Sequence, residues 1–320
     1  TTSKIKFIGL HAHSVAGSIF DAVGYPQDHM DFAYENGMSA LALTDHGNMN
    51  GLAYQVLHAK KMKAEGKDFK PIFGCEAYFI PSVEEWREEY DKAMTDKKKA
   101  RSVRKDDRPG ATVEDEGESK VSQDILRRRR HLILLAQNQT GLNNLFKLVS
   151  ESYKSENFYR YPRVDYALLE KYGEGIIAAS ACLGGVYAGC YWENRDEGEE
   201  AVLDAMRDAT RRMVDIFGDR WYAELQWHNL PEQHELNQYI IKVAKEFGVG
   251  LISTADSHYP SPDAWKDREL YKRLGWLGKS TSRPDYLSDE LPQSIDETNC
   301  ELYPKNGDQM WENYQRFSQQ

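Results

Sequence analysis

The sequence predicts an α/β fold: a distorted seven-stranded (β/α)7 TIM-like barrel with a helical C-terminal extension. Short apolar runs alternate with longer segments of helical periodicity from residue 5 to residue 254, and Gly37, Gly66 and Gly248 follow three of the helical segments as stops. Strands that alternate with helices imply parallel pairing through right-handed crossovers, which favours a closed or nearly closed barrel. The working face of such a barrel lies at the carboxyl ends of its strands.

The apolar runs define the predicted strands in chain order. They cover residues 5–10, 39–43, 71–79, 131–136, 175–179, 221–227 and 250–254. The helices predicted between them cover about residues 27–36, 52–64, 142–152, 166–172, 199–217 and 230–247. In the last of these, Leu236, Ile240 and Val243 fall at helical spacing, which predicts a buried face.

Composition divides the chain into a barrel domain at 1–275 and an extension at 276–320. A charged insertion at about 82–130 interrupts the barrel domain. Trp86 and Tyr90 predict that its first part is helical, and residues 106–119 are typical of a mobile surface loop. The insertion is either a solvated excursion or an arm that touches nucleic-acid phosphates.

Composition also narrows the class of protein. The chain has 320 residues and no apolar run of the roughly 20 residues that cross a bilayer, so no membrane association is expected. Its four cysteines form no C-x-x-C pair, which fits a reducing compartment and predicts a cytoplasmic protein. A formal net charge of −10 argues against general binding to nucleic acid, although carboxylates that surround cations are neutralised locally.

Metal-ligand side chains follow the predicted strands. His11 and His13 end the first strand, and Asp256 and His258 end the last one, at opposite ends of the chain. A single His-x-His pair is weak evidence, but two such pairs make a shared metal centre the leading hypothesis. Further candidates near strand ends are Asp21, Asp45, His46, Glu76, His131, Cys182 and Glu224. The periodicity does not explain why Glu76 and His131 sit so early in their strands.

Several candidates have plainer explanations. Cys75 is expected to be a buried thiol, and Cys182 is either a thiol of that kind or a ligand. Asp21 is either a helix cap or a ligand, and Glu224 either binds metal or orients another ligand. His228 and His234 are expected at the surface, and His29 and His58 are not expected to bind metal.

The short sequence motifs around these residues resemble those of a known family. They include Thr44-Asp45-His46-Gly47, Gly74-Cys75-Glu76-Ala77-Tyr78, Ser180-Ala181-Cys182-Leu183-Gly184-Gly185 and Asp256-Ser257-His258-Tyr259. Over about residues 5–275 the chain resembles the PHP (polymerase and histidinol phosphatase) domain, in particular the N-terminal PHP domain of bacterial C-family DNA polymerases of the replicative alpha-subunit type. Residues 301–305 resemble the segment that leads toward the thumb and palm of these polymerases.

The resemblance implies up to three divalent metals, zinc, manganese or iron, at the strand ends. Carried over by position, the ligands are His11, His13, Asp21, His46, Glu76, His131, Cys182, Asp256 and His258. Among these, His11, His13, Glu76, Asp256 and His258 are the expected catalytic residues. Asp45 and Glu224 are expected to support the ligands from behind, and Arg163 is a candidate phosphate clamp.

The expected chemistry is metal-assisted phosphoester hydrolysis, which in the polymerase setting is 3′–5′ proofreading of a DNA primer end. The partners would be the primer 3′ end, the rest of the polymerase and other replisome subunits. The aromatics of residues 158–161 either stack on unpaired bases or form a packed loop. Two alternatives are a structural metal-binding module and a free-standing phosphatase on a small phosphomonoester. The polymerase active site is expected outside this chain, because no close aspartate cluster follows Ser261.

Overall fold

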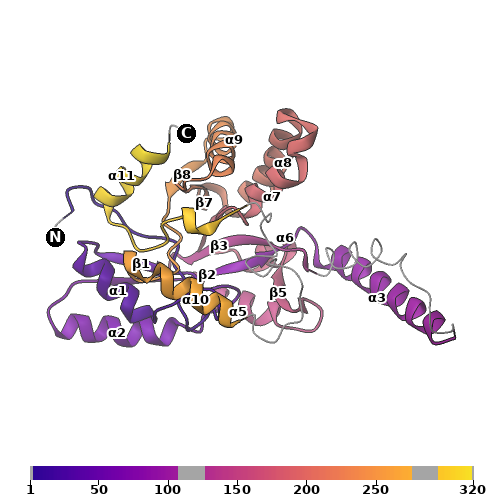
Figure 1. The fold of residues 1–320 in the computed structure, drawn as a ribbon, viewed down its shortest axis with the longest axis horizontal. Helices are drawn as coiled ribbons and strands as arrows, with labels where there is room; N and C mark the ends of the chain where they lie inside the picture. Colours follow the sequence, from indigo (N-terminus) through magenta and orange to yellow (C-terminus); the bar gives the residue numbers. More distant parts are fainter. Residues whose placement is uncertain (1–2, 107–126, 276–294, 319–320) are drawn as a thin grey trace.

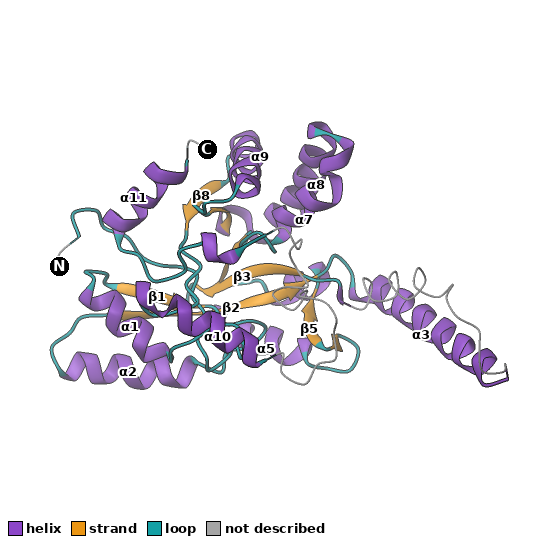
Figure 2. Ribbon diagram, in the orientation of Figure 1, coloured by secondary structure: helices purple, strands orange, loops and turns teal. Residues whose placement is uncertain are grey.

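The computed structural model describes residues 3–106, 127–275 and 295–318, and it has the predicted α/β fold class. A curved mixed sheet runs through the centre, with α1 and α2 on one side and α7, α8 and α9 on the other (Figures 1 and 2). The strands are β1 (Ala40–Leu43), β2 (Lys70–Phe79), β3 (Arg130–Ala136), β4 (Phe158–Tyr159), β5 (Tyr161–Val164), β6 (Ile176–Ala179), β7 (Trp221–Leu225) and β8 (Gly250–Ser253). The helices are α1 (Pro26–Glu35), α2 (Leu52–Ala64), α3 (Val83–Asp106), α5 (Gln139–Ser152), α6 (Tyr166–Tyr172), α7 (Val186–Asn194), α8 (Glu199–Phe217), α9 (Pro231–Phe247), α10 (Trp265–Leu274) and α11 (Gly307–Phe317).

The sheet is a half-barrel whose strands follow the order β4-β5-β2-β3-β6-β7-β8, with β1 paired to β2 beside this path. The pairings β1–β2, β6–β7 and β7–β8 are parallel, as predicted. Apolar side chains from both faces form the core, in which Leu132, Leu134, Ile176 and Ala223 are almost completely buried. Six of the seven predicted strands are present at nearly the predicted bounds.

The seventh prediction, a strand at residues 5–10, is wrong. Only single bridges form here, between Gly9 and Leu41 and between Ala12 and Ser257, and both are parallel. Ile5 and Ile8 are more than 40% exposed, so the apolar run is not a buried strand. The segment nevertheless connects β1 to the residues after β8, because His13 N–H donates to Ser257 O at 2.7 Å and Ala42 N–H donates to Gly9 O at 2.8 Å.

The expectation that all strands are parallel is wrong for β3. This strand runs antiparallel to both of its neighbours, with Cys75 opposite Leu134 in β2 and Leu134 opposite Ala178 in β6. A parallel neighbour requires a crossover that carries the chain back to the other end of the strands. The chain instead enters β3 at the end where β2 stops, with Arg130 opposite Phe79, so the two strands are antiparallel. As a result, the start of β3 lies where the parallel strands end.

The predicted helix at the start of the insertion is α3, which extends away from the body of the protein in Figure 1. Trp86 at its base is 2% exposed and packs with Ile80 and Val83. Most of the predicted loop at 106–119 lies outside the described residues. The short hairpin β4–β5 and helix α7 were not predicted from the sequence.

The C-terminal segment packs on the barrel and contacts the N-terminal end of the chain. Asp308 at the start of α11 accepts hydrogen bonds from the backbone N–H groups of Lys4 and Ile5, each at 3.0 Å. The predicted domain boundary at 275/276 adjoins a stretch outside the described residues, so it stays a prediction. Within the described residues, no helix is both long enough and apolar enough to cross a membrane.

Candidate metal centre

The structure brings all nine predicted ligands to one edge of the barrel. They come from the segment before β1, the turns after β1, β6 and β8, and strands β2 and β3. Every one of the nine has a nitrogen, oxygen or sulfur atom within 3.4 Å of another member. Three overlapping groups can each hold a cation: His13 with His46 and His258, His11 with His13 and Asp256, and His46 with Glu76 and His131. This arrangement suits several adjacent cations rather than one.

Glu76 lies at the middle of the cluster. Its carboxylate oxygens lie 2.7 Å from His46 Nδ1, 3.0 Å from His11 Nε2, 3.3 Å from His131 Nδ1 and 3.4 Å from His13 Nε2. Both oxygens are buried, yet neither makes a hydrogen bond of acceptable geometry. Buried carboxylate oxygens are costly without a partner. The lone pairs of the surrounding imidazoles and of this carboxylate point into one small volume, and this donor set fits divalent cations.

The two ends of the chain meet beside Glu76. Asp256 Oδ1 lies 2.9 Å from His11 Nε2 and 3.1 Å from His13 Nε2. The His13 and His258 rings face each other with their centroids 4.4 Å apart. The backbone hydrogen bonds between residues 11–13 and Ser257 hold these two segments in register, so the pairing follows from the bridge between the N-terminal segment and the turn after β8.

Asp21 and Cys182 lie at opposite sides of the cluster. Asp21 Oδ2 lies 2.9 Å from His46 Nε2 and 3.1 Å from His258 Nε2, so it faces two ligands at once. Cys182 Sγ lies 3.4 Å from His131 Nδ1. In each case the placement favours the ligand interpretation over a helix cap or an isolated thiol.

The positions of Glu76 and His131 follow from the topology. β2 continues beyond the end of β1, and Glu76 forms a parallel bridge to His46 at that level. His131 is the second residue of β3 and reaches the same edge because that strand runs antiparallel. The early positions of Glu76 and His131 in their strands therefore follow from the extension of β2 and the antiparallel direction of β3.

Glu224 contacts His11, and Asp45 contacts the loop that follows His13. Glu224 Oε1 lies 2.6 Å from His11 Nδ1, which fixes that ring with its Nε2 toward the cluster. Gln226 Nε2 and the Thr254 hydroxyl donate to the same carboxylate oxygen. Asp45 accepts from the backbone N–H of Ser14 at 2.7 Å and from the Ser18 hydroxyl at 2.7 Å, which holds the loop after His13.

The electrostatics separate the imidazoles into two kinds. Burial, with smaller contributions from His46 and His258, lowers the pKa of His13 to about 3, so its ring is neutral and able to bind a cation. Burial also opposes protonation of His11, but Asp256, Glu224 and Glu76 outweigh it and raise the pKa of His11 well above its usual value. Ligand binding requires neutral imidazole, so a cation would displace a proton there.

The carboxylates stay ionised despite their burial. Burial would raise the pKa of Glu76, but the four histidines around it, His131 first, hold that pKa well below its usual range. His11 and His258 have the same effect on Asp256, whose pKa is also well below its usual range. The thiol of Cys182 differs, because burial and the charges of Asp256 and Glu76 raise its pKa. Two negative oxygen ligands are therefore available near neutral pH.

The backbone near three ligands is in the left-handed region. Phe20 precedes Asp21 with φ of 61°, Ala181 precedes Cys182 with φ of 62°, and Asp256 itself has φ of 50°. Side chains other than glycine rarely adopt this conformation, and such positions cluster at functional sites. Packing and hydrogen bonds hold these turns so that the ligands face inward.

The phosphate-clamp role expected for Arg163 needs correction. Arg163 is fully buried, and its guanidinium donates to the carbonyl groups of Arg128 and Tyr159 and lies 4.1 Å above the Trp86 ring. It anchors the insertion rather than facing the metal ligands. The aromatic stretch is a packed hairpin, in which Tyr161 packs edge-on against Tyr78.

Two histidine predictions have different outcomes. His228 is 7% exposed rather than at the surface, and its Nε2 lies 2.9 Å from Gln226 Oε1. His58 lies on α2 and its Nε2 lies 2.7 Å from Asp31 Oδ1, away from the cluster.

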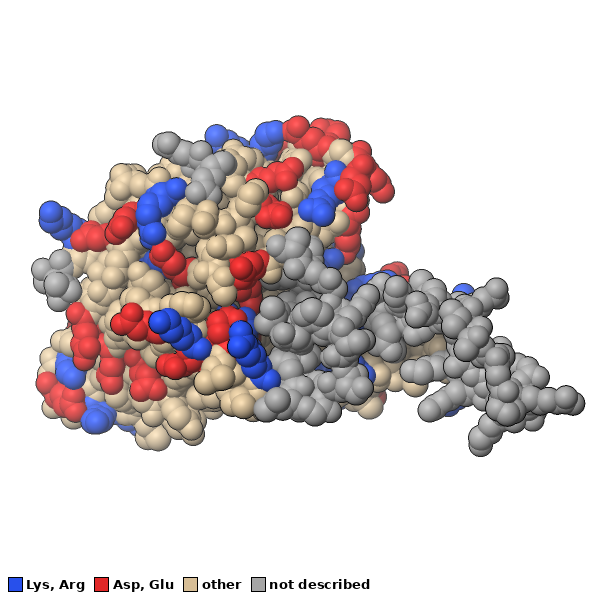
Figure 3. Space-filling view, in the orientation of Figure 1, with Lys and Arg blue, Asp and Glu red and all other residues tan. Residues whose placement is uncertain are grey.

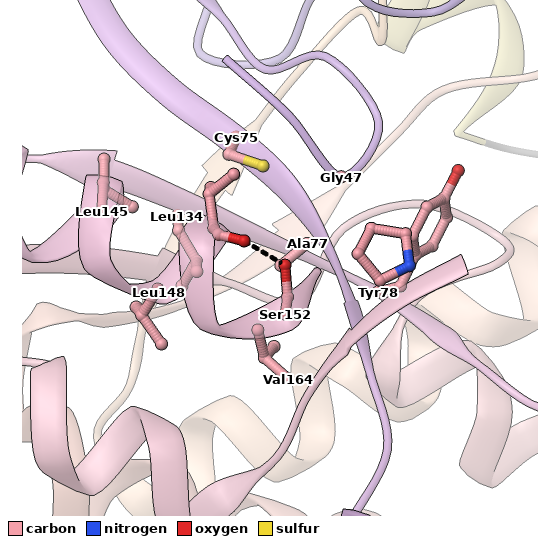
Figure 4. A pocket seen from close by; sticks show the side chains of 11 residues that line it. Gly47, Cys75, Ala77, Tyr78, Leu134, Leu145, Leu148, Ser152 and Val164 are labelled. Atoms are coloured by element: carbon pink, nitrogen blue, oxygen red, sulfur yellow. Dashed lines mark hydrogen bonds between the residues drawn. The ribbon is translucent and has the colours of Figure 1, made fainter. Parts of the chain in front are cut away.

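A small apolar pocket lies behind the metal ligands, between β2, β5 and α5 (Figure 4). Cys75, Leu134, Leu145 and Leu148 line it, and the Ser152 hydroxyl that borders it already donates to the Val149 carbonyl. Cys75 is thus a buried thiol, as expected. The lining offers no charged group for a phosphate, so the pocket is not part of the metal centre.

Three residues that contact ligands or their loops were not predicted from the sequence. Ser14 and Ser18 belong to a small polar loop whose position directly after His13 was an available signal. Arg268 on α10 donates two hydrogen bonds to Asp21, at 2.6 and 2.7 Å. Nothing in the local pattern of that charged helix distinguishes Arg268 from its neighbours.

Comparison with known proteins identifies the family of this chain. The model of the PHP domain family matches residues 9–228. The DNA polymerase III subunit alpha of Aquifex aeolicus is 38% identical over 80% of this chain and 18% of its own length, and that of Borreliella burgdorferi is 33% identical over 94% and 22%. This chain thus spans about a fifth of the length of these relatives.

Among solved structures, an amidohydrolase from Chromobacterium violaceum matches 82% of this chain and 96% of its own, with a TM-score of 0.43 and 14% identity. The family match covers the segments that carry His11, His13, Asp21, His46, Glu76, His131 and Cys182. The chain is homologous to the PHP region of DNA polymerase III alpha subunits and belongs to the PHP domain family.

Proposed function

We propose that this chain is the PHP module of a C-family replicative DNA polymerase and that it hydrolyses phosphodiester bonds at the 3′ end of a DNA primer. The observation that carries the proposal is the meeting of nine ligand side chains from distant segments around the buried Glu76 carboxylate. The homology to polymerase alpha subunits supports DNA as the substrate class.

Divalent cations held by this donor set would supply Lewis acidity for the phosphate oxygens and activate water at neutral pH. The residues determine where the substrate can approach. The side chains of His11, His13 and Glu76 are 0% exposed, whereas Asp21 is 33% exposed and His46 is 12% exposed. A phosphodiester therefore approaches from the side of Asp21 and His46, while the buried ligands keep the interior dry.

The chain's own groups also orient the ligands for this task. His258 Nδ1 lies 2.7 Å from the Asp256 carbonyl, which directs its Nε2 toward Asp21. Glu224 does the same for His11 from the opposite side. Rings fixed in this way need little reorganisation when charge develops on the phosphate.

The test uses the purified 320-residue chain, stripped with a chelator and then supplied with Mn²⁺ or Zn²⁺. A labelled primer with a 3′ mismatch on a template should be shortened only when metal is present. H11A and D256A should each lower the rate by more than about 100-fold, because each removes a ligand. H58A is the matched control, since His58 pairs with Asp31 on α2. Full activity of H11A and D256A would refute a metal-centred nuclease.

Two other functions give different results in the same experiment. Tight metal binding without hydrolysis of any DNA end would support a module that stabilises the polymerase or docks a replisome subunit. Faster turnover of a sugar phosphate than of a DNA end would support a phosphatase on small phosphomonoesters. The polymerase-like motifs around Cys182 and Glu224 favour a polymerase module over the free-standing phosphatase, and the hydrolysis assay separates the nuclease from the structural module.

A further inference from the structure

The ligand Asp21 is held by a residue from outside the matched family region. Arg268 lies on α10, and its side chain is 2% exposed. Its Nε donates to the Asp21 carbonyl at 2.6 Å, and its Nη2 donates to Asp21 Oδ1 at 2.7 Å. The guanidinium therefore donates hydrogen bonds to both the backbone and the side chain of Asp21.

These two hydrogen bonds determine which Asp21 oxygen faces the metal centre. With Oδ1 bound to Arg268, Oδ2 is left toward His46 Nε2 and His258 Nε2. Without Arg268, only the two imidazole contacts on Oδ2 would hold this carboxylate, which is one-third exposed. A planar guanidinium that donates two hydrogen bonds restricts that rotation in a way that a point charge does not.

A buried charge network supports Arg268 in turn. Its Nη1 lies 3.6 Å from Glu297 Oε2, and Lys272 Nζ lies 3.0 Å from the same oxygen. Lys272 also pairs with Glu269 at 2.8 Å. Breaking a buried ion pair leaves an uncompensated charge, so this network fixes the position of α10 relative to Glu297.

The same C-terminal region binds a second ligand segment. The backbone N–H of His258 donates to the Leu302 carbonyl at 2.8 Å, and the Tyr259 hydroxyl accepts from Leu302 N–H at 2.8 Å. Residues 265–274 and 297–302 thus contact the backbone or side chain of both Asp21 and His258.

We propose that Arg268 is a positioning residue that orients Asp21 as a metal ligand, so that the region after β8 completes the metal centre. Arg268 does not contact substrate, because it is buried and its donors face Asp21 and Glu297. The inference rests on the metal centre of the proposed function and is independent of whether DNA is the substrate.

The test measures metal affinity directly. The full chain is stripped with a chelator and titrated with Mn²⁺ by calorimetry and by electron paramagnetic resonance. R268Q should weaken one class of bound ion about 10- to 100-fold while the remaining ions bind as in the wild type. R268K should lie in between, because an ammonium cannot reproduce the two-point contact. R207Q is the matched control, because Arg207 also pairs with three carboxylates but lies on α8.

A double-mutant cycle separates positioning from general stability. If Arg268 acts through Asp21, then D21N/R268Q should bind Mn²⁺ no more weakly than D21N alone. Thermal unfolding of each variant in chelator reports any loss of folding. Equal weakening of all bound ions, additive effects in the cycle, or unchanged affinity in R268Q would each overturn the proposal. A wild-type chain that binds no Mn²⁺ or Zn²⁺ would instead overturn the proposed function itself.

Discussion

At the scale of single residues, the metal centre depends on which imidazole nitrogen faces inward. A neutral imidazole offers one lone pair, and the hydrogen bond at the other nitrogen decides which one it is. For His11 that bond goes to the Glu224 carboxylate. For His258 it goes to the Asp256 carbonyl. For Glu224 this contact supports the orienting role, one of the two alternatives that the sequence left open.

E224Q should therefore weaken metal binding about 10- to 100-fold without unfolding the chain. The amide is nearly the same size as the carboxylate but has no charge to support the His11 N–H. E235Q is a suitable control, because Glu235 accepts a hydrogen bond from Tyr191 away from the cluster. Calorimetric titration with Zn²⁺ measures the effect, and equal affinity in the two variants would contradict the role given to Glu224.

His29 gives a prediction for pH dependence. Burial lowers its pKa to about 4, although a hydrogen bond to the Val23 carbonyl opposes the shift. The unfolded chain takes up this proton near the ordinary pKa of about 6.5 and the folded chain only near 4. The free energy of unfolding therefore falls as the pH drops from 6.5 toward 4, by up to about 3 kcal/mol from this residue.

H29Q should make the free energy of unfolding depend less on pH in this window. The expected decrease in slope corresponds to the uptake of up to one proton on unfolding. Urea unfolding of wild type and variant in chelator, between pH 7 and pH 4.5, measures it. The difference between the two chains removes the contributions of the other histidines. Parallel curves would show that His29 is not held neutral.

At the scale of elements, the turn after β1 shows how local geometry positions a ligand. Gly47 follows His46 with φ of +70°, and its N–H donates to the Glu76 carbonyl at 2.8 Å. A Cβ atom there would lie 2.9 Å from Pro162 Cγ and 3.0 Å from Tyr78 Cε2. The turn is thus restricted to glycine both by its backbone conformation and by its close neighbours.

G47A should destabilise the chain by about 2–4 kcal/mol, since left-handed strain and overpacking add. G66A is the matched control, because Gly66 has φ of +77° but a Cβ there meets nothing within 4 Å. Its cost should be only about 1 kcal/mol. Urea unfolding compares the two variants, and equal losses would show that the contacts with Pro162 and Tyr78 do not matter.

At the scale of the whole molecule, charge and shape separate the barrel from its insertion. Basic and acidic side chains alternate over the face in Figure 3, and acidic ones gather over the outer part of α8. The described residues on this face form no broad basic surface for a duplex, in keeping with the net charge of −10. In the described part of the insertion, Val83, Trp86 and Tyr90 at the base of α3 pack in a small apolar cluster with Ile80 and Tyr159.

Replacing residues 94–126 with a short Gly/Ser linker should leave the metal affinity and the thermal unfolding temperature nearly unchanged. The segments that flank the excision already contact each other through their side chains, because Arg128 Nη1 is 3.4 Å from Glu89 Oε1. Metal titration and primer binding are measured on both chains. Unchanged primer binding fits a solvated insertion, whereas weaker and less salt-dependent binding would identify an arm that touches phosphates.

The sequence by itself determined the α/β class and six of the strands, and it predicted a set of candidate metal ligands. Buried strands and amphipathic helices leave regular spacings of apolar residues, and ligand residue types are recognisable wherever a strand ends. These signals are local, so they identified His11, His46 and His258 without any knowledge of pairing.

Only the tertiary structure decided the direction of β3, the burial of Arg163 and the hydrogen bonds from Arg268 to Asp21. A period of two reports which face of a strand is buried but not which way the strand runs, so the early position of His131 had no local explanation. Arg268 and Asp21 are 247 positions apart, and an arginine on a charged helix looks the same whether it meets water or a carboxylate. That distinction exists only after the chain folds, because burial and hydrogen-bond partners arise from contacts between distant segments.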